Sequence, residues 1–419
     1  TDYFIKVFNA IQDQIEAENI LAGHDISSGG LITTLLEMCF TDNETGMELD
    51  LSSIDVMDSV KLLFSENPGL VIQPDNAAKF ESALTFKGVN FVKIGKPAKV
   101  PTCTVKNFDN LLELDVASLR DLWFKSSYLL DRKQSGEKQA LERYKNYKKN
   151  ELQFDFKNFT GKASDYGIDL NRRKPSGVKA AIIREKGVNG DREMAYAMYL
   201  AGMDVKDVHM TDLIAGRETL EDVNMIVFVG GFSNSDVLGS AKGWAGAFKY
   251  NERAQLALEN FYKRNDTLSL GVCNGCQLMV ELGLIYPDHD EMPKMLHNES
   301  HKFESAFVNV EIPENSSVML GSMAGQKLGV WVAHGEGKFS LPKAESEYKV
   351  TMKYLGEGYP ANPNGSMYNI AGLCSNNGRH LVMMPHLERA FKPWHWANYP
   401  RERKNDEVAP WIEAFVNAK

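Results

Sequence analysis

One short segment, residues 271–277, combines residue types that could perform nucleophilic catalysis. It reads Gly-Val-Cys-Asn-Gly-Cys-Gln and stands between an apolar strand-like run and an apolar helix-like run. Strand, sharp turn and helix in this order are typical of a nucleophile elbow, whose glycines allow close backbone packing around an exposed residue at the tip. That residue is Cys273. A helix N-terminus favours thiolate over thiol, and its N–H groups can hold a developing oxyanion.

A thiolate nucleophile needs a base, and the base needs a group that orients it. His386 and Glu388 directly follow the strand-like run 380–384. Residues two apart in an extended segment point to the same side, so Glu388 could fix the tautomer of His386 and stabilise its protonated form. The long chain separation between Cys273 and His386 is normal for a triad that the fold assembles. His334 is a weaker candidate for the base, because it lacks this position at the end of a strand.

The spacing of Cys273 and Cys276 also allows other interpretations. C-x-x-C can be a redox pair or half of a zinc site, and a lone cysteine is often a buried structural residue. A four-ligand zinc site needs a second pair of ligands, and no convincing pair stands at that spacing elsewhere in the chain. We therefore interpret Cys276 as a packing residue on the helix after the elbow.

Composition bounds the class of protein. The 419 residues suffice for about two or three domains with cores of their own. Five scattered cysteines favour a reducing cytoplasm over a disulfide scaffold, and a net charge of −9 argues against nucleic acid as the main partner. No run approaches the roughly 18 apolar residues of a membrane span, so we expect no membrane partner. Because the chain opens on Thr1, inside an amphipathic pattern, we expect a piece of a longer polypeptide.

From residue 178 onward the pattern alternates between strand and helix. We predict strands over 178–183, 205–209, 225–229 and 268–272, and helices over 192–201 and 254–264. This alternation is typical of a doubly wound, mostly parallel α/β sheet, in which sites lie beyond the carboxyl ends of strands. Arg184, the pair Gly230-Gly231 and Cys273 each follow a predicted strand. We therefore expect them to face one crevice.

The first part of the chain also reads as α/β. We predict a helix over about 2–19, a loop at 24–30, a second helix after it, and strands at 69–72 and 89–94. Apolar residues between Leu114 and Leu129 then suggest helix. The Lys- and Arg-rich stretch 132–149 fits a solvated helical linker better than the alternative, a basic partner surface. In the loop, Asp25 and Ser27 precede two glycines, a pattern that suits phosphate and Mg²⁺ but is more often an ordinary turn.

These segments resemble, in order, those of a known family. Gly-x-Cys-x-Gly-x-Gln with a late His-x-Glu is similar to class I, triad-type glutamine amidotransferases. More closely, the chain from about residue 175 resembles the glutaminase domain of large-type phosphoribosylformylglycinamidine synthases, through residues 184–189, 230–233, 271–277, 334–337, 359–366 and 385–389. The block 23–31 resembles a loop of the synthetase part of the same enzymes. Departures from the family pattern fall at Asn234, Ser235, Leu387 and Ser28.

The resemblance implies a fold and a set of site residues. It implies a partial synthetase domain at 1–105, similar to the C-terminal domain of aminoimidazole ribonucleotide synthetase. A helical linker at 106–174 and a flavodoxin-like glutaminase domain at 175–419 would follow. It also implies the following roles: Cys273, His386 and Glu388 would be catalytic; Gly231, Phe232 and Asn274 would form the oxyanion hole; Asp25 would contact Mg²⁺ and Ser27 a nucleotide.

The implied reaction is hydrolysis of L-glutamine in the cytoplasm. Its ammonia would serve the ATP-dependent conversion of formylglycinamide ribonucleotide to the amidine in purine biosynthesis. The short N-terminal part carries no Walker-type loop, so we expect this chain alone to act as a glutaminase only. Two other classes remain open on the residues alone: a partner-binding module without catalysis, and a cysteine peptidase or esterase built on the same elbow.

Overall fold

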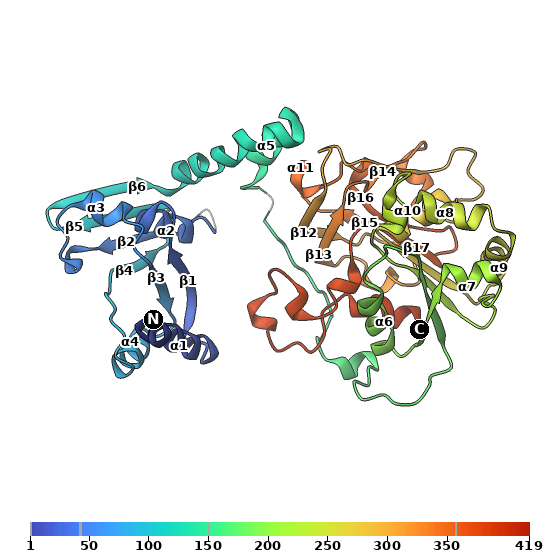
Figure 1. Ribbon diagram of the computed structural model, residues 1–419, viewed down its shortest axis with the longest axis horizontal. Coiled ribbons are helices and arrows are strands. Elements are labelled where there is room, and N and C mark those ends of the chain that lie inside the picture. The colour runs from blue at the N-terminus through green and yellow to red at the C-terminus, as the bar shows by residue number, and fades with distance from the viewer. Residues whose placement is uncertain (1, 42–43, 150, 357) are drawn as a thin grey trace. The chain divides into compact units, whose positions relative to one another are not determined.

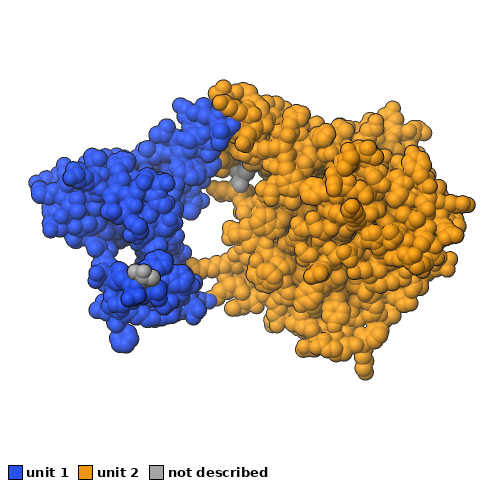
Figure 2. Space-filling model, in the orientation of Figure 1, with its two compact units in different colours: residues 1–130 blue, residues 131–419 orange. Residues whose placement is uncertain are grey.

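The computed structural model describes residues 2–41, 44–149, 151–356 and 358–419 (Figure 1). The chain divides into two compact units, residues 1–130 and residues 131–419, coloured separately in Figure 2. Each unit has hydrophobic core of its own. The division falls within helix α5 (Val116–Asn146), in which Gly136 has non-helical angles of φ 80° and ψ 165°. The expected linker of residues 106–174 is thus shared between the two units. No helix in the described part of the chain is long and apolar enough to cross a membrane.

Unit 1 contains two small sheets and four short helices before α5. The four-stranded sheet has the order β4-β2-β5-β6, and the two-stranded sheet pairs β1 with β3. The strands are β1 (Ile20–Ile26), β2 (Gly46–Asp50), β3 (Gly69–Pro74), β4 (Gly95–Ala98), β5 (Thr102–Asn107) and β6 (Asn110–Asp115); the helices are α1 (Asp2–Glu16), α2 (Gly30–Cys39), α3 (Ser59–Phe64) and α4 (Ala77–Phe86). The main core of this unit lies between α2 and the four-stranded sheet.

Three predictions for unit 1 were wrong in detail. Asp25 lies on strand β1 rather than in a loop, because residues 20–26 pair with β3. Residues 89–94 form no strand: Val89 packs into a small core beside α1 and α4 while Val92 is half exposed, and strand pairing begins only at β4. Leu114 lies on β6, paired with Cys103 of β5, and the helix starts two residues later.

Unit 2 is built on a nine-stranded sheet with the order β13-β12-β15-β16-β17-β10-β9-β7-β8. The run from β17 to β8 is parallel, and the run from β13 to β16 is antiparallel and joins β17 on its other side. The strands are β7 (Lys179–Arg184), β8 (Asp204–His209), β9 (Met225–Phe228), β10 (Leu268–Val272), β12 (Glu304–Glu311), β13 (Lys327–His334), β15 (Lys349–Tyr354), β16 (Ile370–Cys374) and β17 (His380–Met383). Strands β11 (Lys294–Leu296) and β14 (Lys338–Ser340) form a separate pair.

The central strands are short apolar runs buried along their whole length, as expected of parallel strands that helices cover on both faces. The helices are α6 (Asp191–Leu200), α7 (Met210–Ala215), α8 (Lys242–Lys249), α9 (Glu252–Lys263), α10 (Asn274–Glu281), α11 (Gly358–Ala361) and α12 (Ile412–Ala418). The predicted doubly wound, mostly parallel fold is confirmed. The antiparallel strands β12 to β16 were not predicted.

The strand order predicts a site at the carboxyl ends of the parallel strands. From β7 the chain moves outward to β8, whereas from β9 it moves the opposite way to β10. Right-handed crossovers then put α6 on one face and α7 to α10 on the other. At such a switch point the loops diverge and leave a crevice beyond the carboxyl ends of the strands. The loops after β7, β9, β10 and β17 all begin at these carboxyl ends.

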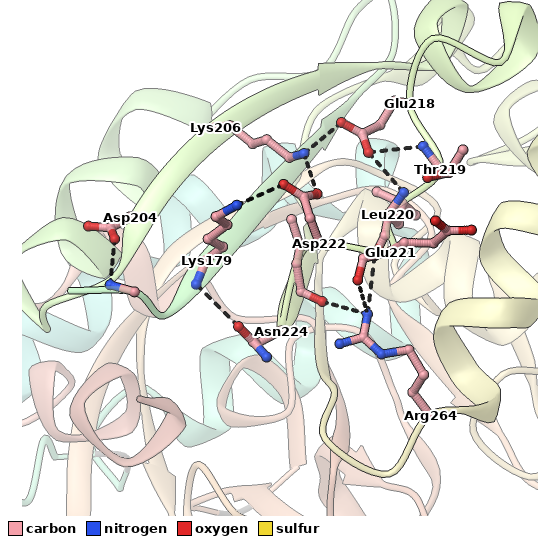
Figure 3. Close-up of polar contacts among 12 residues, drawn as sticks. Lys179, Asp204, Lys206, Glu218, Thr219, Leu220, Glu221, Asp222, Asn224 and Arg264 are labelled. Carbon is pink, nitrogen blue, oxygen red and sulfur yellow. Dashed lines mark hydrogen bonds and ion pairs between the residues drawn. The ribbon is translucent and has the colours of Figure 1, made fainter. Parts of the chain in front are cut away.

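A charged cluster ties together the segments around β7, β8 and β9 (Figure 3). Lys206 Nζ lies 2.7 Å from a carboxylate oxygen of Glu218 and 2.8 Å from one of Asp222, and Lys179 Nζ lies 3.1 Å from the other Asp222 oxygen. Arg264, at the end of α9, donates to the backbone carbonyls of Leu220, Glu221 and Val223. The cluster therefore holds the turn before β9 in place with both side-chain and backbone partners.

Candidate active site

Cys273 stands at a sharp turn between β10 and α10. Its backbone has φ 52° and ψ −107°, a conformation rarely adopted by residues other than glycine and often found where strain serves function. A Cβ on Gly275 would collide with the carbonyl oxygen of Phe228, so only glycine lets α10 approach β9 this closely. Cys273 is 4% exposed, and its Sγ lies 3.5 Å from the carbonyl oxygen of Ala333. The predicted strand, turn and helix around this residue are present.

His386 and Glu388 lie beside each other at the end of β17. Nδ1 of His386 is 2.6 Å from Oε1 of Glu388, and the two side chains are 2% and 0% exposed. Because β17 pairs in parallel with β10, the segment after β17 and Cys273 after β10 lie at the same end of the two strands. A Cβ on Gly230 would lie 2.7 Å from Cε1 of His386 and 3.4 Å from Cβ of Cys273. The structure thus brings the three predicted catalytic residues into one buried site.

The charges in this site favour a protonated imidazole. Burial opposes the charge on His386, but the neighbouring Glu388 carboxylate and Cys273 sulfur outweigh it and raise the pKa of His386 from 6.5 to about 10. Glu388 occupies Nδ1, so Nε2 is the ring nitrogen left for the sulfur, and it has no conventional hydrogen-bond partner. An imidazolium beside a thiolate can protonate a leaving amine.

The amides predicted to hold an oxyanion come from two loops. Asn274 opens α10, and its side-chain oxygen accepts from Ser233 N–H over 3.2 Å, which ties α10 to the loop after β9. The N–H of Phe232 donates to the carbonyl of Gly187 over 2.9 Å. This leaves the Gly231 amide as the candidate donor on that loop. The oxyanion roles of Gly231, Phe232 and Asn274 remain predictions.

His334 and Cys276, the other candidates for the base and for a reactive cysteine, lie in different surroundings. His334 is buried, and burial together with the charge of His386 lowers its pKa to about 3, so it is neutral rather than a general base. Its Nε2 pairs with the side-chain amide of Asn364 over 3.0 Å. Cys276 is a free thiol on α10 that is fully buried in the core, and burial raises its pKa. Neither residue is placed to replace Cys273 or His386 in the site.

The predicted metal and nucleotide residues belong to unit 1. Asp25 projects from β1 with its side chain 68% exposed, and Oδ1 lies 3.6 Å from Nδ1 of His24. Ser27 opens the turn into α2, where its carbonyl accepts from Gly30 N–H over 3.0 Å. A single exposed carboxylate fits Mg²⁺ held mainly by phosphate oxygens and water. No group of three or more metal-ligating side chains occurs among the described residues.

A cleft of about 720 Å³ lies in unit 2, and neither Cys273 nor His386 is among its lining residues. Its wall includes Glu336, whose backbone carbonyl accepts from the Gln277 side chain over 2.7 Å and whose carboxylate accepts from Ser240 N–H over 3.4 Å. Charged side chains of both signs line it: Lys138, Lys242, Glu299, Glu336 and Lys338. Mixed charges suit a zwitterion such as an amino acid. Sequence reasoning gave no role to Glu299 or Lys138, because only the fold brings them to this wall.

Comparison with known proteins defines the class. Residues 177–419 match the family model described as the CobB/CobQ-like glutamine amidotransferase domain, and residues 4–106 match that of the AIR synthase related protein, C-terminal domain. The chain belongs to the CobB/CobQ-like glutamine amidotransferase family.

The relatives narrow this class. Over 447 residues the chain is 40% identical to the probable phosphoribosylformylglycinamidine synthase, chloroplastic/mitochondrial, of Arabidopsis thaliana, covering 100% of this chain and 31% of that protein. Over 450 residues it is 38% identical to phosphoribosylformylglycinamidine synthase of Homo sapiens, covering 99% of this chain and 33% of that protein. The chain spans about a third of the length of these relatives. The solved structure of PurLQS from Thermotoga maritima aligns over 58% of this chain and 97% of that chain, with 24% identity and a TM-score of 0.46.

Proposed function

We propose that this chain hydrolyses the side-chain amide of L-glutamine, with Cys273 as nucleophile, His386 as acid and base, and Glu388 as the group that orients it. The observation that carries the proposal is the buried His386–Glu388 pair, 2.6 Å apart, beside a cysteine on a strained turn. A partner-binding module without catalysis would not need this buried ion pair, since removing charges from water costs several kcal/mol.

The steps follow from the geometry. The Cys273 thiolate adds to the amide carbon, and the Asn274 and Gly231 amides bind the resulting oxyanion. The C–N bond then breaks as the imidazolium of His386 gives its proton to the leaving nitrogen, which releases ammonia and leaves a γ-glutamyl thioester. Neutral His386 next takes a proton from water, the hydroxide adds to the thioester, and glutamate leaves as the thiolate forms again. Each oxyanion donor is expected to contribute about 3–4 kcal/mol to the transition state.

Release of glutamate and ammonia from glutamine tests this proposal. We expect turnover by the chain, with no turnover by Cys273→Ala and covalent labelling of Cys273 by a glutamine-mimicking electrophile. Cys276→Ala is the matched control, because it removes a buried thiol three residues away without touching the proposed nucleophile. Cleavage of peptides without glutamine hydrolysis, or labelling on another residue, would contradict the proposal.

We further propose that the ammonia serves the conversion of formylglycinamide ribonucleotide to its amidine with ATP and Mg²⁺, in the cytoplasm. The support is the agreement of both units with phosphoribosylformylglycinamidine synthases along their whole length. By the same resemblance Asp25 would supply one oxygen to Mg²⁺, and Ser27 would contact the nucleotide. We expect glutamine-dependent amidine formation only when this chain is combined with the remaining synthetase part of such an enzyme. Amidine formation that proceeds equally well without this chain would contradict the proposal.

A further inference from the structure

The loop between β7 and α6, residues 185–190, has no assigned role in the mechanism above. It belongs to a segment whose sequence resembles that of the family, and the fold places it at the switch point between β7 and β9. It contacts two parts of the candidate site. One contact is with the loop after β9, which carries the proposed oxyanion amide, and the other is with the residues that follow His386.

The first contact is a short antiparallel pairing with the loop after β9. Phe232 N–H donates to the carbonyl of Gly187 over 2.9 Å, and Asn189 N–H donates to the carbonyl of Gly230 over 2.9 Å. These two bonds flank the bridged pair Val188 and Gly231. In such a pair the N–H and C=O of the two facing residues point outward, away from each other. The pairing therefore turns the Gly231 amide away from β7, toward the side of β9 on which β10 and Cys273 lie.

Glycine is required on both sides of this pairing. Gly187 has φ +93°, and a Cβ there would collide with the carbonyl oxygen of Phe232. Gly231 has φ +122°, and a Cβ there would lie 2.6 Å from Cα of Val188. The two backbones approach each other more closely than any side chain would allow. The orientation of the Gly231 peptide therefore depends on the β7–α6 loop as well as on its own sequence.

The second contact reaches the orienting carboxylate. The side-chain oxygen of Asn189 accepts from Nη2 of Arg389 over 2.7 Å, and Nε of Arg389 lies 3.8 Å from Oε1 of Glu388. A Cβ on Gly190 would lie 3.3 Å from both of these side chains, so the loop packs directly against them. Asn189 thus pairs with the loop after β9 through its backbone, and it holds Arg389 beside Glu388 through its side chain.

We propose that the β7–α6 loop is a positioning element that couples the two halves of the site: Gly187 sets the direction of the Gly231 amide, and Asn189 fixes Arg389 against Glu388. Neither residue touches the reacting atoms in this assignment. The inference rests on the proposed glutaminase function, and it adds two residues whose effect on turnover is indirect. It also explains why residues 187–190 combine two glycines with an asparagine.

The test for Gly187 compares two glycine substitutions in the full chain. We expect Gly187→Ala to lower kcat for glutamine hydrolysis by about 10²–10³-fold, as for loss of one oxyanion donor, with KM changed less than about threefold. Alkylation of Cys273 by iodoacetamide needs no oxyanion hole and should keep its rate. Gly177→Ala is the matched control, because Gly177 has φ +85° but nothing within 4 Å of its Cβ position. It should leave both rates unchanged.

Two results would overturn the role of Gly187. One is a Gly187→Ala variant with kcat within twofold of the parent. The other is alkylation that falls in step with kcat, which would mean that the loop supports the nucleophile or the fold. An inactive parent chain would instead refute the proposed function itself, so the two failures can be told apart.

A second pair of variants tests Asn189 without straining the backbone. Asn189→Ala removes the acceptor for Arg389 but keeps the backbone bond to Gly230, and we expect kcat to fall about tenfold with KM nearly unchanged, as for a misaligned catalytic group. Asn189→Asp keeps an acceptor oxygen at the same place and should restore most of the activity. Equal activity of Asn189→Ala and the parent, or no recovery in Asn189→Asp, would overturn this role.

Discussion

At the scale of single residues, the environment of His386 decides what the site can do. Its imidazole lies beside Glu388 and Cys273, and all three residues are buried. Burial alone would favour the neutral ring, so the raised pKa of His386 depends on these two neighbours. In the proposed reaction the same residue would later accept a proton from water, once the Cys273 sulfur is held in a thioester.

Glu388→Gln tests this dependence. The amide preserves the shape and a hydrogen bond but removes the charge, so the pKa of His386 should fall and less imidazolium should face the leaving nitrogen. We expect kcat to drop by about 10²–10⁴-fold, the usual range for impaired acid–base catalysis, with little change in KM. The measurement is steady-state glutaminase activity together with a thermal unfolding curve. Activity above half that of the parent would show that the charge is not needed.

The raised pKa of His386 also predicts how stability depends on pH. A folded-state pKa near 10, above the unfolded value of 6.5, stabilises the fold fully below pH 6.5 and loses its effect as pH rises through 10. The difference in free energy of unfolding between the parent and His386→Asn should therefore shrink from pH 6.5 to pH 10. Denaturant unfolding of both proteins at several pH values measures it. A difference that grows with pH would contradict the assignment.

The sequence was sufficient to single out Cys273, His386 and Glu388 as candidates, but not the peptide groups around them. Cys273 and His386 stand at the ends of apolar runs that could be recognised without coordinates. By contrast, the direction of the Gly231 amide depends on a pairing with residues far away in the chain. Such a contact leaves no periodic pattern. His334 shows the same limit, since its burial and its pairing with Asn364 are set by strands β12 to β16, which were not predicted.

At the scale of elements, the fit of α10 against β9 is the feature that places the nucleophile. Gly275 lies where the helix meets the last residue of β9, and any side chain there would collide with backbone. We expect Gly275→Ala to destabilise unit 2 by about 3 kcal/mol or more, in the range of overpacked cores.

Gly246→Ala is the matched control for Gly275→Ala. Gly246 lies inside helix α8, and the nearest atom to its Cβ position is a ring carbon of Tyr250 at 3.8 Å, an ordinary contact. Because alanine favours helix over glycine, this change should stabilise the protein by about 0.5–1 kcal/mol. Thermal unfolding of both variants measures the contrast. Equal effects of the two substitutions would show that close packing at Gly275 is unimportant.

The turn before β9 depends on carbonyl contacts more than on exposed ion pairs. The pKa of Asp222 is lowered to about 2, first by Lys206 and then by Lys179, but the carboxylate is half exposed. Asp222→Asn should cost less than about 1 kcal/mol, and the cost should fade in 1 M salt. Arg264→Lys removes the planar group that reaches three backbone carbonyls and should cost about 1–3 kcal/mol at any salt concentration. Denaturant unfolding at two salt concentrations compares them.

The parallel half of the sheet could be predicted because most of its strands, such as β7, β9 and β10, are largely apolar runs that alternate with helical segments. The pattern is weaker elsewhere. Strand β12 neither alternates strictly nor forms a continuous apolar run, and β11 and β14 are only three residues long, so none of the three gives a distinct signal. The misplaced strand at 89–94 has the opposite cause: its residues are apolar enough for a strand, but the regular pairing with β2 begins only at Gly95.

At the scale of the whole molecule, the chain contains two units with separate cores. The core of unit 1 is small and split into two clusters, whereas that of unit 2 extends through the nine-stranded sheet. We expect calorimetry to show two unfolding transitions, with unit 1 melting at the lower temperature because it buries less apolar surface. Arg264→Lys should lower only the transition of unit 2. A single transition that shifts as a whole would contradict independent unfolding.

Strand β17 is the last strand of the sheet in chain order, yet it occupies the middle position, with β16 on one side and β10 on the other. Until it is inserted, the parallel and antiparallel halves have no shared edge, and His386 is not beside Cys273. During synthesis the candidate site therefore cannot assemble before residues 380–388 have been made and β17 has joined β10. With the proposed function, the first turnover of glutamine would report that this insertion has taken place.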